Sequence, residues 1–342
     1  PRKNSSLRTT GWKILLATAI GLGVVAWMFW REFNPETLRS FHFDARSIVC
    51  LVLAALAVFG RDFGLTWRFR SITDGQLSWK RAFQVDLMCA FTSAITPSAV
   101  GGSPAAIFYL TREGISVGRA TTLTLTTLLL DELFFVVFCP IIVLLVPLDL
   151  LFGDGGAVLG SVKVIFWTVY TAIVFYTVLL FAGTLWRPYA VASALHRLFG
   201  LRFLRKLQPK IDNMTANMVA TSQTLRKCSL RWWSRVFGAT VVSWFSRYLV
   251  VNALFWGFVP SADGLLVFGR QFVVWVVLMV SPTPGGSGVS EWLFSNYYGD
   301  LIGNVSLALL LAIVWRLYSY YIYLVAGAFL APRYFKKRKT HE

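Results

Sequence analysis

The sequence predicts an all-α polytopic membrane protein with about six spanning helices and two re-entrant hairpins, arranged as an inverted-topology repeat. Of its 342 residues, 56% are hydrophobic and only 14% are charged, so too few polar side chains remain to cover a soluble surface. Long apolar runs recur along the chain, and two shorter runs are interrupted by proline and glycine. The order of these runs predicts the topology.

Six apolar runs reach the length of about 20 residues that a helix needs to cross the hydrocarbon core. The first follows a basic stretch and carries tryptophans at its ends, where interfacial aromatic residues belong. A charged loop at residues 31–46 separates it from the second run, and a glycine-rich loop at residues 149–160 precedes the fourth. The predicted spans are residues 12–30, 47–67, 120–147, 162–186, 236–258 and 301–331.

Two further apolar segments are too short to cross alone. Residues 82–95 would extend about 21 Å as a helix, against a hydrocarbon thickness of about 30 Å. Proline lacks a backbone donor and glycine is a poor helix former, so a cluster of both ends a helix. We therefore expect two hairpins. The first, within about 82–111, has arms at residues 82–95 and 105–111 around the break Thr96–Pro104. The second, within about 265–298, has arms at residues 265–280 and 289–298 around the break Pro282–Gly288.

The distribution of positive charge predicts the orientation. If the N-terminus is inside, Arg247 and Arg316 fall within spans, and the outer loops hold only five Lys and Arg residues: Arg31, Arg39, Arg46, Lys163 and Arg270. This leaves 26 of the 33 on the inner side, as the positive-inside rule requires. The net charge of +17 is then mostly topological, and a nucleic-acid partner is not expected. We expect a plasma (inner) membrane protein with cytoplasmic termini, a cytoplasmic amphipathic segment at 187–235 and a basic tail at 332–342.

The predicted spans divide the chain into two similar halves, residues 1–149 and 150–331. Each half has three crossings and one hairpin, and an odd number of crossings inverts the second half. Aligning the pair Gly101-Gly102 with Gly285-Gly286 also places Glu132 and Arg316 at the same offset in the following helix. Spacing and topology therefore both indicate an inverted repeat.

The Gly-Gly pairs predict a binding site for an anion. In the predicted hairpins, the helix after each pair points its N-terminus, with unpaired N–H groups and a positive dipole end, toward the bilayer centre. For a single cluster, a helix kink or close packing would be the preferred explanation, but the matched pair favours binding. The expected substrate-binding residues are Pro97, Gly101, Gly102, Ser103, Pro284, Gly285, Gly286, Ser287 and Arg316.

Charged residues within the predicted spans are expensive and need partners. Asp131 and Glu132 lie inside the third span, and Arg316 is the expected partner, with Arg247 as a second candidate. Glu291 follows the second break and could pair or exchange a proton. Two interpretations stay open: a structural ion pair, or an Arg316 that binds phosphate while a carboxylate exchanges a proton.

The sequence predicts neither an enzyme nor a cofactor or metal. Its 4 cysteines are scattered without a CxxC pair, which indicates neither a disulfide framework nor a zinc site. The motifs of P-loop ATPases, serine hydrolases, zinc proteases and dinucleotide-binding proteins are missing from the sequence.

Four segments resemble the lysylphosphatidylglycerol synthase transmembrane family, also called the flippase-like domain family: Thr96–Pro104, the helix with Asp131, Pro284–Glu291, and Arg316–Tyr318. The resemblance covers nearly the whole chain and implies an inner-membrane lipid translocator. It concerns the membrane part only. Since the sequence stops at Glu342 without the soluble aminoacyl-transfer domain of bifunctional members, lysyl-lipid synthesis is not expected.

We therefore expect a non-enzymatic translocator that moves an anionic phospholipid or lipid-linked phosphate between leaflets, its head group held by the two broken helices. One alternative is an ion-coupled transporter of a small soluble anion. Another is a non-catalytic scaffold for envelope lipid enzymes. The expected partners are an anionic lipid and the membrane, and a homo-oligomer is compatible with the sequence.

Overall fold

The computed structural model describes residues 44–96, 102–153, 157–199, 208–281, 283 and 285–336, and the regular elements within these ranges are all helices. The predicted span 12–30 and the end of the basic tail lie outside them. The same holds for Pro97, Gly101 and Pro284 and for the side chain of Ser103, whereas the backbone of Gly102 begins the helix Gly102–Arg112.

Four described helices are long and apolar enough to cross a membrane, namely Ala45–Ile72, Val117–Leu145, Gly160–Trp186 and Val305–Ala331. They coincide with four predicted spans, and Leu230–Phe258 (α11) forms a helix of 29 residues over a fifth, 236–258. Helices α3 (Ala45–Ile72) and α6 (Val117–Leu145) are continuous. A π-helical turn, Ala182–Trp186, extends α8 (Ala157–Phe181), and another, Leu317–Tyr321, connects α15 (Val305–Arg316) with α16 (Ile322–Lys336).

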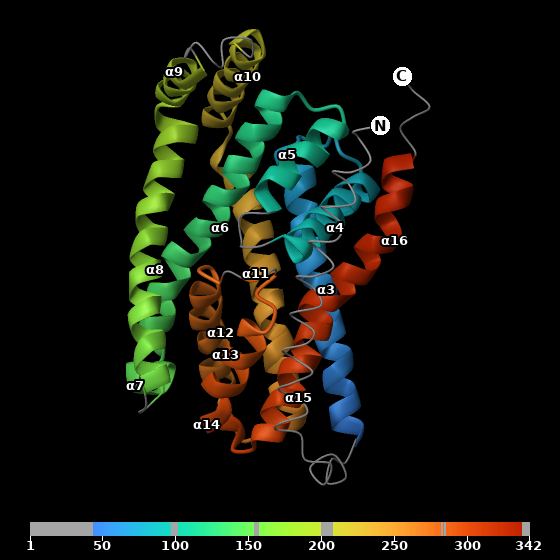
Figure 1. The fold of residues 1–342 in the computed structure, drawn as a ribbon, viewed down its shortest axis with the longest axis vertical. Coiled ribbons are helices and arrows are strands. Elements are labelled where there is room, and N and C mark those ends of the chain that lie inside the picture. The colour runs from blue at the N-terminus through green and yellow to red at the C-terminus, as the bar shows by residue number, and fades with distance from the viewer. Residues whose placement is uncertain are drawn as a thin grey trace, which may run out of the picture.

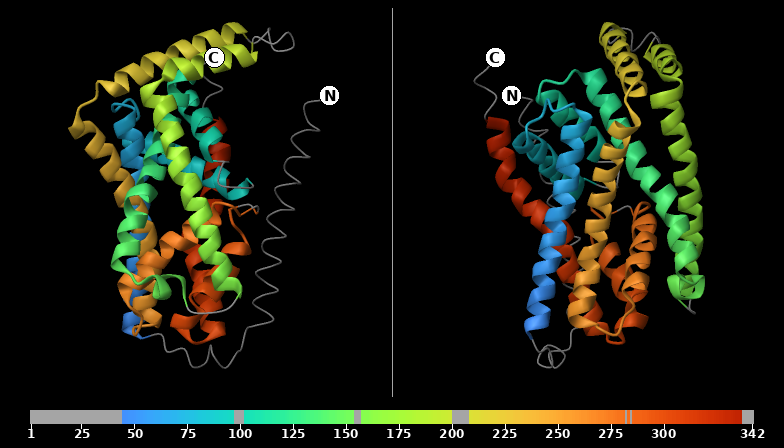
Figure 2. Two further views of the ribbon diagram at one scale, coloured as in Figure 1. Left: turned by 90° about the vertical axis from the view of Figure 1, so that its left-hand side faces the viewer. Right: turned by 180° about the vertical axis from the view of Figure 1, so that it is seen from behind.

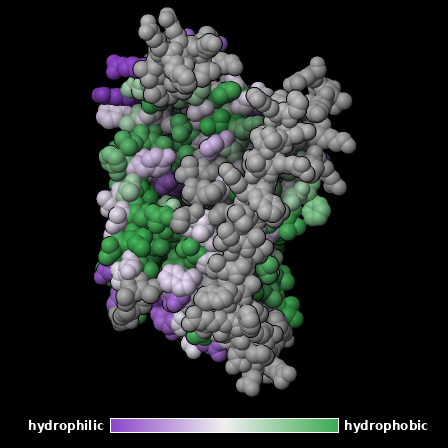
Figure 3. Space-filling view, in the orientation of Figure 1, coloured by the Kyte–Doolittle hydropathy of each residue, from purple (hydrophilic) through white to green (hydrophobic). Residues whose placement is uncertain are grey.

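The long helices run side by side as a bundle (Figure 1). Hydrophobic residues gather in a broad region over the middle of the face shown in Figure 3, and hydrophilic residues lie toward its upper and lower margins. This distribution is expected of a protein surrounded by lipid at mid-height. Several helices start at a side-chain cap that accepts a backbone N–H of the first turn: Asp44, Ser78, Ser229, Asp263 and Asn304.

Helices α3 and α11 pack through glycine at the centre of the bundle. A Cβ on Gly64 would lie 2.7 Å from the amide nitrogen of Ser243, and a Cβ on Gly60 would lie 2.7 Å from the hydroxyl of Ser246. The four-residue spacing puts both glycines on one face of α3, so the two backbones approach closely. This contact holds the polar side chains of α3 next to those of α11.

Two pairs of short helices lie in opposite halves of the bundle, α4 (Trp79–Ile95) with α5 (Gly102–Arg112) and α12 (Gly264–Leu278) with α13 (Val289–Tyr297) (Figure 1). In both segments one helix ends and another begins close to the predicted positions, although α4 and α5 each begin about three residues earlier than expected. In the second break, Gly285, Gly286 and Gly288 have φ angles of 56°, 73° and 81°. Residues other than glycine rarely adopt such positive φ angles, and these angles lie outside the helical range, so the cluster ends the helix.

The segment predicted to be amphipathic, 187–235, forms two helices and the start of a third. Helices α9 (Pro188–Phe199) and α10 (Gln208–Arg226) lie across one end of the bundle (Figure 2), and the residues from Leu230 belong to α11. The opposite end carries the short helices α7 (Leu148–Phe152) and α14 (Gly299–Ile302) (Figure 1).

Arg270 was expected in an outer loop, but it lies within α12 with 1% of its surface exposed. Its guanidinium donates to both carboxylate oxygens of Asp300 at 2.6 and 2.7 Å, and to the carbonyl oxygens of Leu150 and Tyr297. Arg270 thus joins four helices at this end of the bundle. The expectation of an outer loop at Arg270 was therefore wrong, because its charge is buried and bonded to Asp300 and two backbone carbonyl groups.

Candidate functional site

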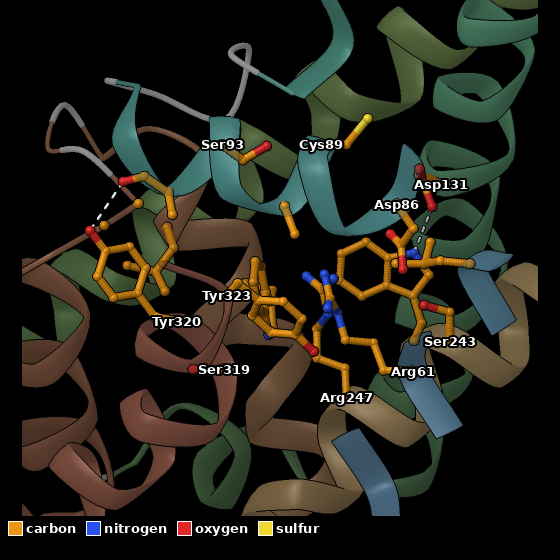
Figure 4. Close-up of a pocket in the computed structure, with 18 of the residues that line it drawn as sticks. Arg61, Asp86, Cys89, Ser93, Asp131, Ser243, Arg247, Ser319, Tyr320 and Tyr323 are labelled. Atoms are coloured by element: carbon orange, nitrogen blue, oxygen red, sulfur yellow. Dashed lines mark hydrogen bonds between the residues drawn. The ribbon is translucent and has the colours of Figure 1, made fainter. Parts of the chain in front are cut away.

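A cavity of about 380 Å³ lies inside the bundle, between α3, α4, α6, α11, the second broken helix and the last helices (Figure 4). The volume lies in the range of small-molecule pockets, so the cavity can hold a polar head group but not a pair of acyl chains. Its lining is mostly apolar, with seven charged side chains: Arg61, Arg68, Asp86, Asp131, Glu132, Arg247 and Arg316.

Asp131 pairs with Arg68 and not, as expected, with Arg316 or Arg247. Arg68 Nη1 lies 2.6 Å from Asp131 Oδ1, and the same oxygen accepts a hydrogen bond of 2.9 Å from Nε1 of Trp244. Arg68 directly follows the predicted second span, 47–67, on the side expected to be cytoplasmic. The helix α3 instead continues past it and aims its side chain at α6.

Arg316 pairs with Glu291 of the second broken helix. Arg316 Nε lies 3.1 Å from Glu291 Oε1, and Arg316 Nη2 donates to the carbonyl oxygen of Gly285 at 2.9 Å. The Arg316 and Glu291 side chains are only 7% and 2% exposed. Of the two interpretations of Arg316, this geometry fits the structural ion pair.

Glu291 also caps the N-terminus of α13, where the sequence predicted a substrate anion. Its Oε2 accepts hydrogen bonds from the backbone N–H of Gly288 and the hydroxyl of Ser290, both at 2.8 Å. A carboxylate at this position satisfies the free N–H groups and interacts favourably with the helix dipole. The protein therefore supplies its own anion at this helix end.

Arg61 and Tyr323 line the cavity and are joined by Asp62, which lies behind its wall. Arg61 Nη1 lies 2.6 Å from Asp62 Oδ1, which also accepts a hydrogen bond of 2.8 Å from the Tyr323 hydroxyl. The Arg61 guanidinium lies 4.2 Å from the centre of the Tyr323 ring. One nitrogen of this guanidinium is thus bound to Asp62, and Arg61 itself lines the cavity.

Arg247 differs from the other arginines of the cavity because the residues that the structure describes offer it no hydrogen-bond acceptor and no carboxylate within ion-pair distance. Its guanidinium lies between the rings of Trp244 and Trp275, 4.6 Å from each centre. Such contacts position a cation but leave its five N–H donors unused. In Figure 4 the guanidinium groups of Arg61 and Arg247 lie close together at the centre of the cavity.

Two carboxylates of the cavity also have no partner among the described residues. Asp86 is 4% exposed and makes no hydrogen bond or ion pair there, and Oε2 of Glu132 is buried without a hydrogen-bond partner. Within these ranges no group of three or more His, Cys, Asp or Glu is arranged to hold a metal ion. The polar chemistry of the cavity is therefore that of arginines and carboxylates.

The structure brings together part of the predicted site. Gly285, Gly286, Asp131, Glu132, Arg247 and Arg316 line the cavity, Ser287 is buried, and Glu291 lies behind Arg316. The sequence analysis missed Arg61, Arg68 and Asp86. Arg61 and Asp86 are charged residues inside predicted apolar segments, and the same signal singled out Asp131. The four-residue spacing of Gly60 and Gly64 marks the face of α3 that packs on α11.

The fold and the site define a class: a multi-pass helical membrane protein with a charged cavity inside its bundle. The chain belongs to the family described as the lysylphosphatidylglycerol synthase TM region, whose profile matches residues 14–327. This confirms the resemblance seen in its motifs. The chain is also similar to a UPF0104 membrane protein of Archaeoglobus fulgidus, with 23% identity over 294 residues, 81% of this chain and 85% of the relative.

Proposed function

We propose that this protein is a lipid translocator that moves an anionic phospholipid or lipid-linked phosphate between leaflets, with the head group bound in the cavity. The observation that carries the proposal is Arg247, whose guanidinium faces the cavity with all of its donors unused by the described residues. An unpaired charge in a membrane interior is costly, so an anion is the expected occupant.

Phosphate is the anion that fits this arrangement best. Guanidinium groups bind phosphate oxygens through two parallel charge-assisted hydrogen bonds, and Arg61 adds a second guanidinium beside Arg247. We place the phosphate between these two arginines, and Arg316 keeps the second broken helix in position through Glu291. The cavity volume of about 380 Å³ accommodates a head group while the acyl chains remain in lipid.

The two broken helix pairs supply the moving parts in this proposal. We interpret α4–α5 and α12–α13 as re-entrant hairpins that enter from opposite sides as inverted repeats, a view supported by their positions in opposite halves of the bundle. Tyr320 contacts both, because its ring packs on Gly285 and its hydroxyl donates to the carbonyl oxygen of Ala94 at 3.0 Å. Rocking of the hairpins would expose the cavity to each leaflet in turn. The positive-inside distribution supports an inner membrane location with both termini cytoplasmic.

Leaflet exchange in liposomes tests the proposal. The protein is reconstituted with head-group-labelled phosphatidylglycerol or with a labelled neutral lipid, and exchange is followed for wild type and Arg247→Gln. We expect wild type to exchange the anionic lipid faster than the neutral one, and Arg247→Gln to slow this exchange at least about tenfold, since a charged hydrogen bond contributes about 1.5–3 kcal/mol.

The matched control is Arg231→Gln, which removes the same charge from an exposed position near the start of the same helix. It should exchange lipid like wild type. Equal exchange by wild type and Arg247→Gln would contradict the proposed site. If wild type moves no lipid but takes up inorganic phosphate in a manner that depends on Arg247, the cavity serves a small soluble anion instead.

A further inference from the structure

Asp131 belongs to a chain of contacts that ends at Arg247, and both residues line the cavity (Figure 4). Its Oδ1 accepts hydrogen bonds from Nη1 of Arg68 at 2.6 Å and from Nε1 of Trp244 at 2.9 Å. The centre of the Trp244 ring in turn lies 4.6 Å from the Arg247 guanidinium. Side chains of α3, α6 and α11 thus link a structural ion pair to the proposed anion site.

Helix α6 holds the indole of Trp244 in place from several sides. Asp131, Phe134 and Phe135 have the three- and four-residue spacing that puts side chains on one face of a helix. The Phe134 ring stacks on the indole at 5.6 Å and an interplanar angle of 14°, and the Phe135 ring meets it edge-on at 4.8 Å. Both phenylalanines are fully buried. With its N–H bound to a carboxylate and its ring packed on two buried side chains, the indole is held in one orientation.

A second tryptophan at the same distance from Arg247 offers a comparison. The ring centre of Trp275 also lies 4.6 Å from the Arg247 guanidinium, and the rings of Trp244 and Trp275 meet at 84°. Nε1 of Trp275 is buried without a hydrogen-bond partner among the described residues. Of these two rings, therefore, Trp244 is the one fixed by a hydrogen bond to a carboxylate.

We infer that Asp131 is a positioning residue, which directs the Arg247 guanidinium toward the bound phosphate through Trp244. The inference rests on the proposed function and adds to it the residue that preorganises the anion site. Two rings at 84° form a corner that covers two sides of the guanidinium, so the free N–H donors keep their direction while the corner keeps its shape. A cation that is already directed loses less side-chain entropy when it binds an anion. Asp131 therefore strengthens phosphate binding although it is itself an acid, and Arg68 compensates its charge.

Replacing each tryptophan by phenylalanine separates this role from ring contact alone. Titration calorimetry in detergent measures the binding of short-chain phosphatidylglycerol and of inorganic phosphate. Trp244→Phe keeps a ring beside Arg247 but loses the bond to Asp131, and we expect about tenfold weaker binding, the equivalent of one charge-assisted hydrogen bond. Trp275→Phe makes the same ring exchange at the same distance, and the weaker cation–π attraction should cost only about twofold. Trp256→Phe, at an exposed position of α11, should bind like wild type.

A double-mutant cycle on affinity tests the other end of the chain. Asp131→Asn should weaken binding in the wild-type background and add no further loss in Trp244→Phe. A merely structural Asp131 would instead lower the free energy of unfolding of Asp131→Asn and leave its lipid affinity unchanged. That result, tighter binding by Asp131→Asn, or equal losses in Trp244→Phe and Trp275→Phe would overturn the inference. If Asp131→Asn does not fold, the comparison of the two tryptophan variants decides.

The two ligands separate this inference from the proposed function. If wild type binds inorganic phosphate but no phosphatidylglycerol, and Trp244→Phe still loses more affinity than Trp275→Phe, the positioning role stands and lipid transport is contradicted. If phosphatidylglycerol binds and the two variants lose the same affinity, the positioning role fails and the lipid site stands. Binding of neither ligand would contradict both.

Discussion

Replacing Arg316 by glutamine is expected to loosen the second broken helix and not primarily to remove a lipid contact. The Arg316 and Glu291 side chains are 7% and 2% exposed, with Nε and Oε1 separated by 3.1 Å. Removing one member of such a buried pair leaves the other charge uncompensated, at a cost of about 3–5 kcal/mol. The glutamine variant also loses the hydrogen bond to the Gly285 carbonyl. We therefore expect a loss of about 3 kcal/mol or more in the free energy of unfolding.

The assay is denaturant unfolding in detergent of Arg316→Gln, Glu291→Gln and the double variant. Because either single change already breaks the pair, the second should cost much less than the first, with a coupling of about 2 kcal/mol between the two sites. Arg231→Gln, which removes an exposed arginine, should unfold like wild type. An Arg316→Gln variant with wild-type stability and no binding of short-chain phosphatidylglycerol would refute this reasoning. Arg316 would then be the residue that binds the phosphate.

The remaining predictions concern glycine. Gly64→Ala should destabilise the bundle by about 1–3 kcal/mol, because the added Cβ would lie 2.7 Å from the backbone nitrogen of Ser243. The control is Gly238→Ala, whose Cβ would have nothing within 4 Å, and it should unfold at the same denaturant concentration as wild type or a slightly higher one. Equal stability of both variants would contradict close packing of α3 on α11. Gly285→Ala should slow lipid exchange, because its φ of 56° disfavours a side chain and its Cβ would overlap the Tyr320 ring, and the liposome assay with Gly299→Ala as control checks this. Wild-type exchange by Gly285→Ala would argue against a role of this contact in transport.

The helices and their breaks could be predicted because their signals are local. Apolar length marks α3, α6, α8 and α11, and the cluster around Gly285 ends a helix through the backbone conformation of the glycines themselves. Neither signal depends on what surrounds the segment. The family could be recognised for the same reason, since its motifs lie in these short stretches.

The pairing of the charges could not be predicted, because it depends on residues far apart in the chain. Asp131 meets Arg68 across 63 positions, and Arg316 meets Glu291 across 25. Helical periodicity places each side chain on a face of its own helix, but it does not say which helix that face meets. Arg316 was therefore assigned to the wrong carboxylate, and Arg61 was overlooked.

The sequence by itself determined that this is an all-helical membrane protein whose chain breaks twice at proline and glycine, because hydropathy and helix propensity act over a few neighbouring residues. Only the tertiary structure decided which arginine of the cavity has no hydrogen-bond acceptor among the described residues. Glycine contacts bring α3 against α11, Asp62 and Asp131 are then occupied by Arg61 and Arg68, and Glu291 by Arg316. Arg247 remains between two tryptophans, facing the cavity, because the packing of distant helices has already assigned those three carboxylates to other arginines.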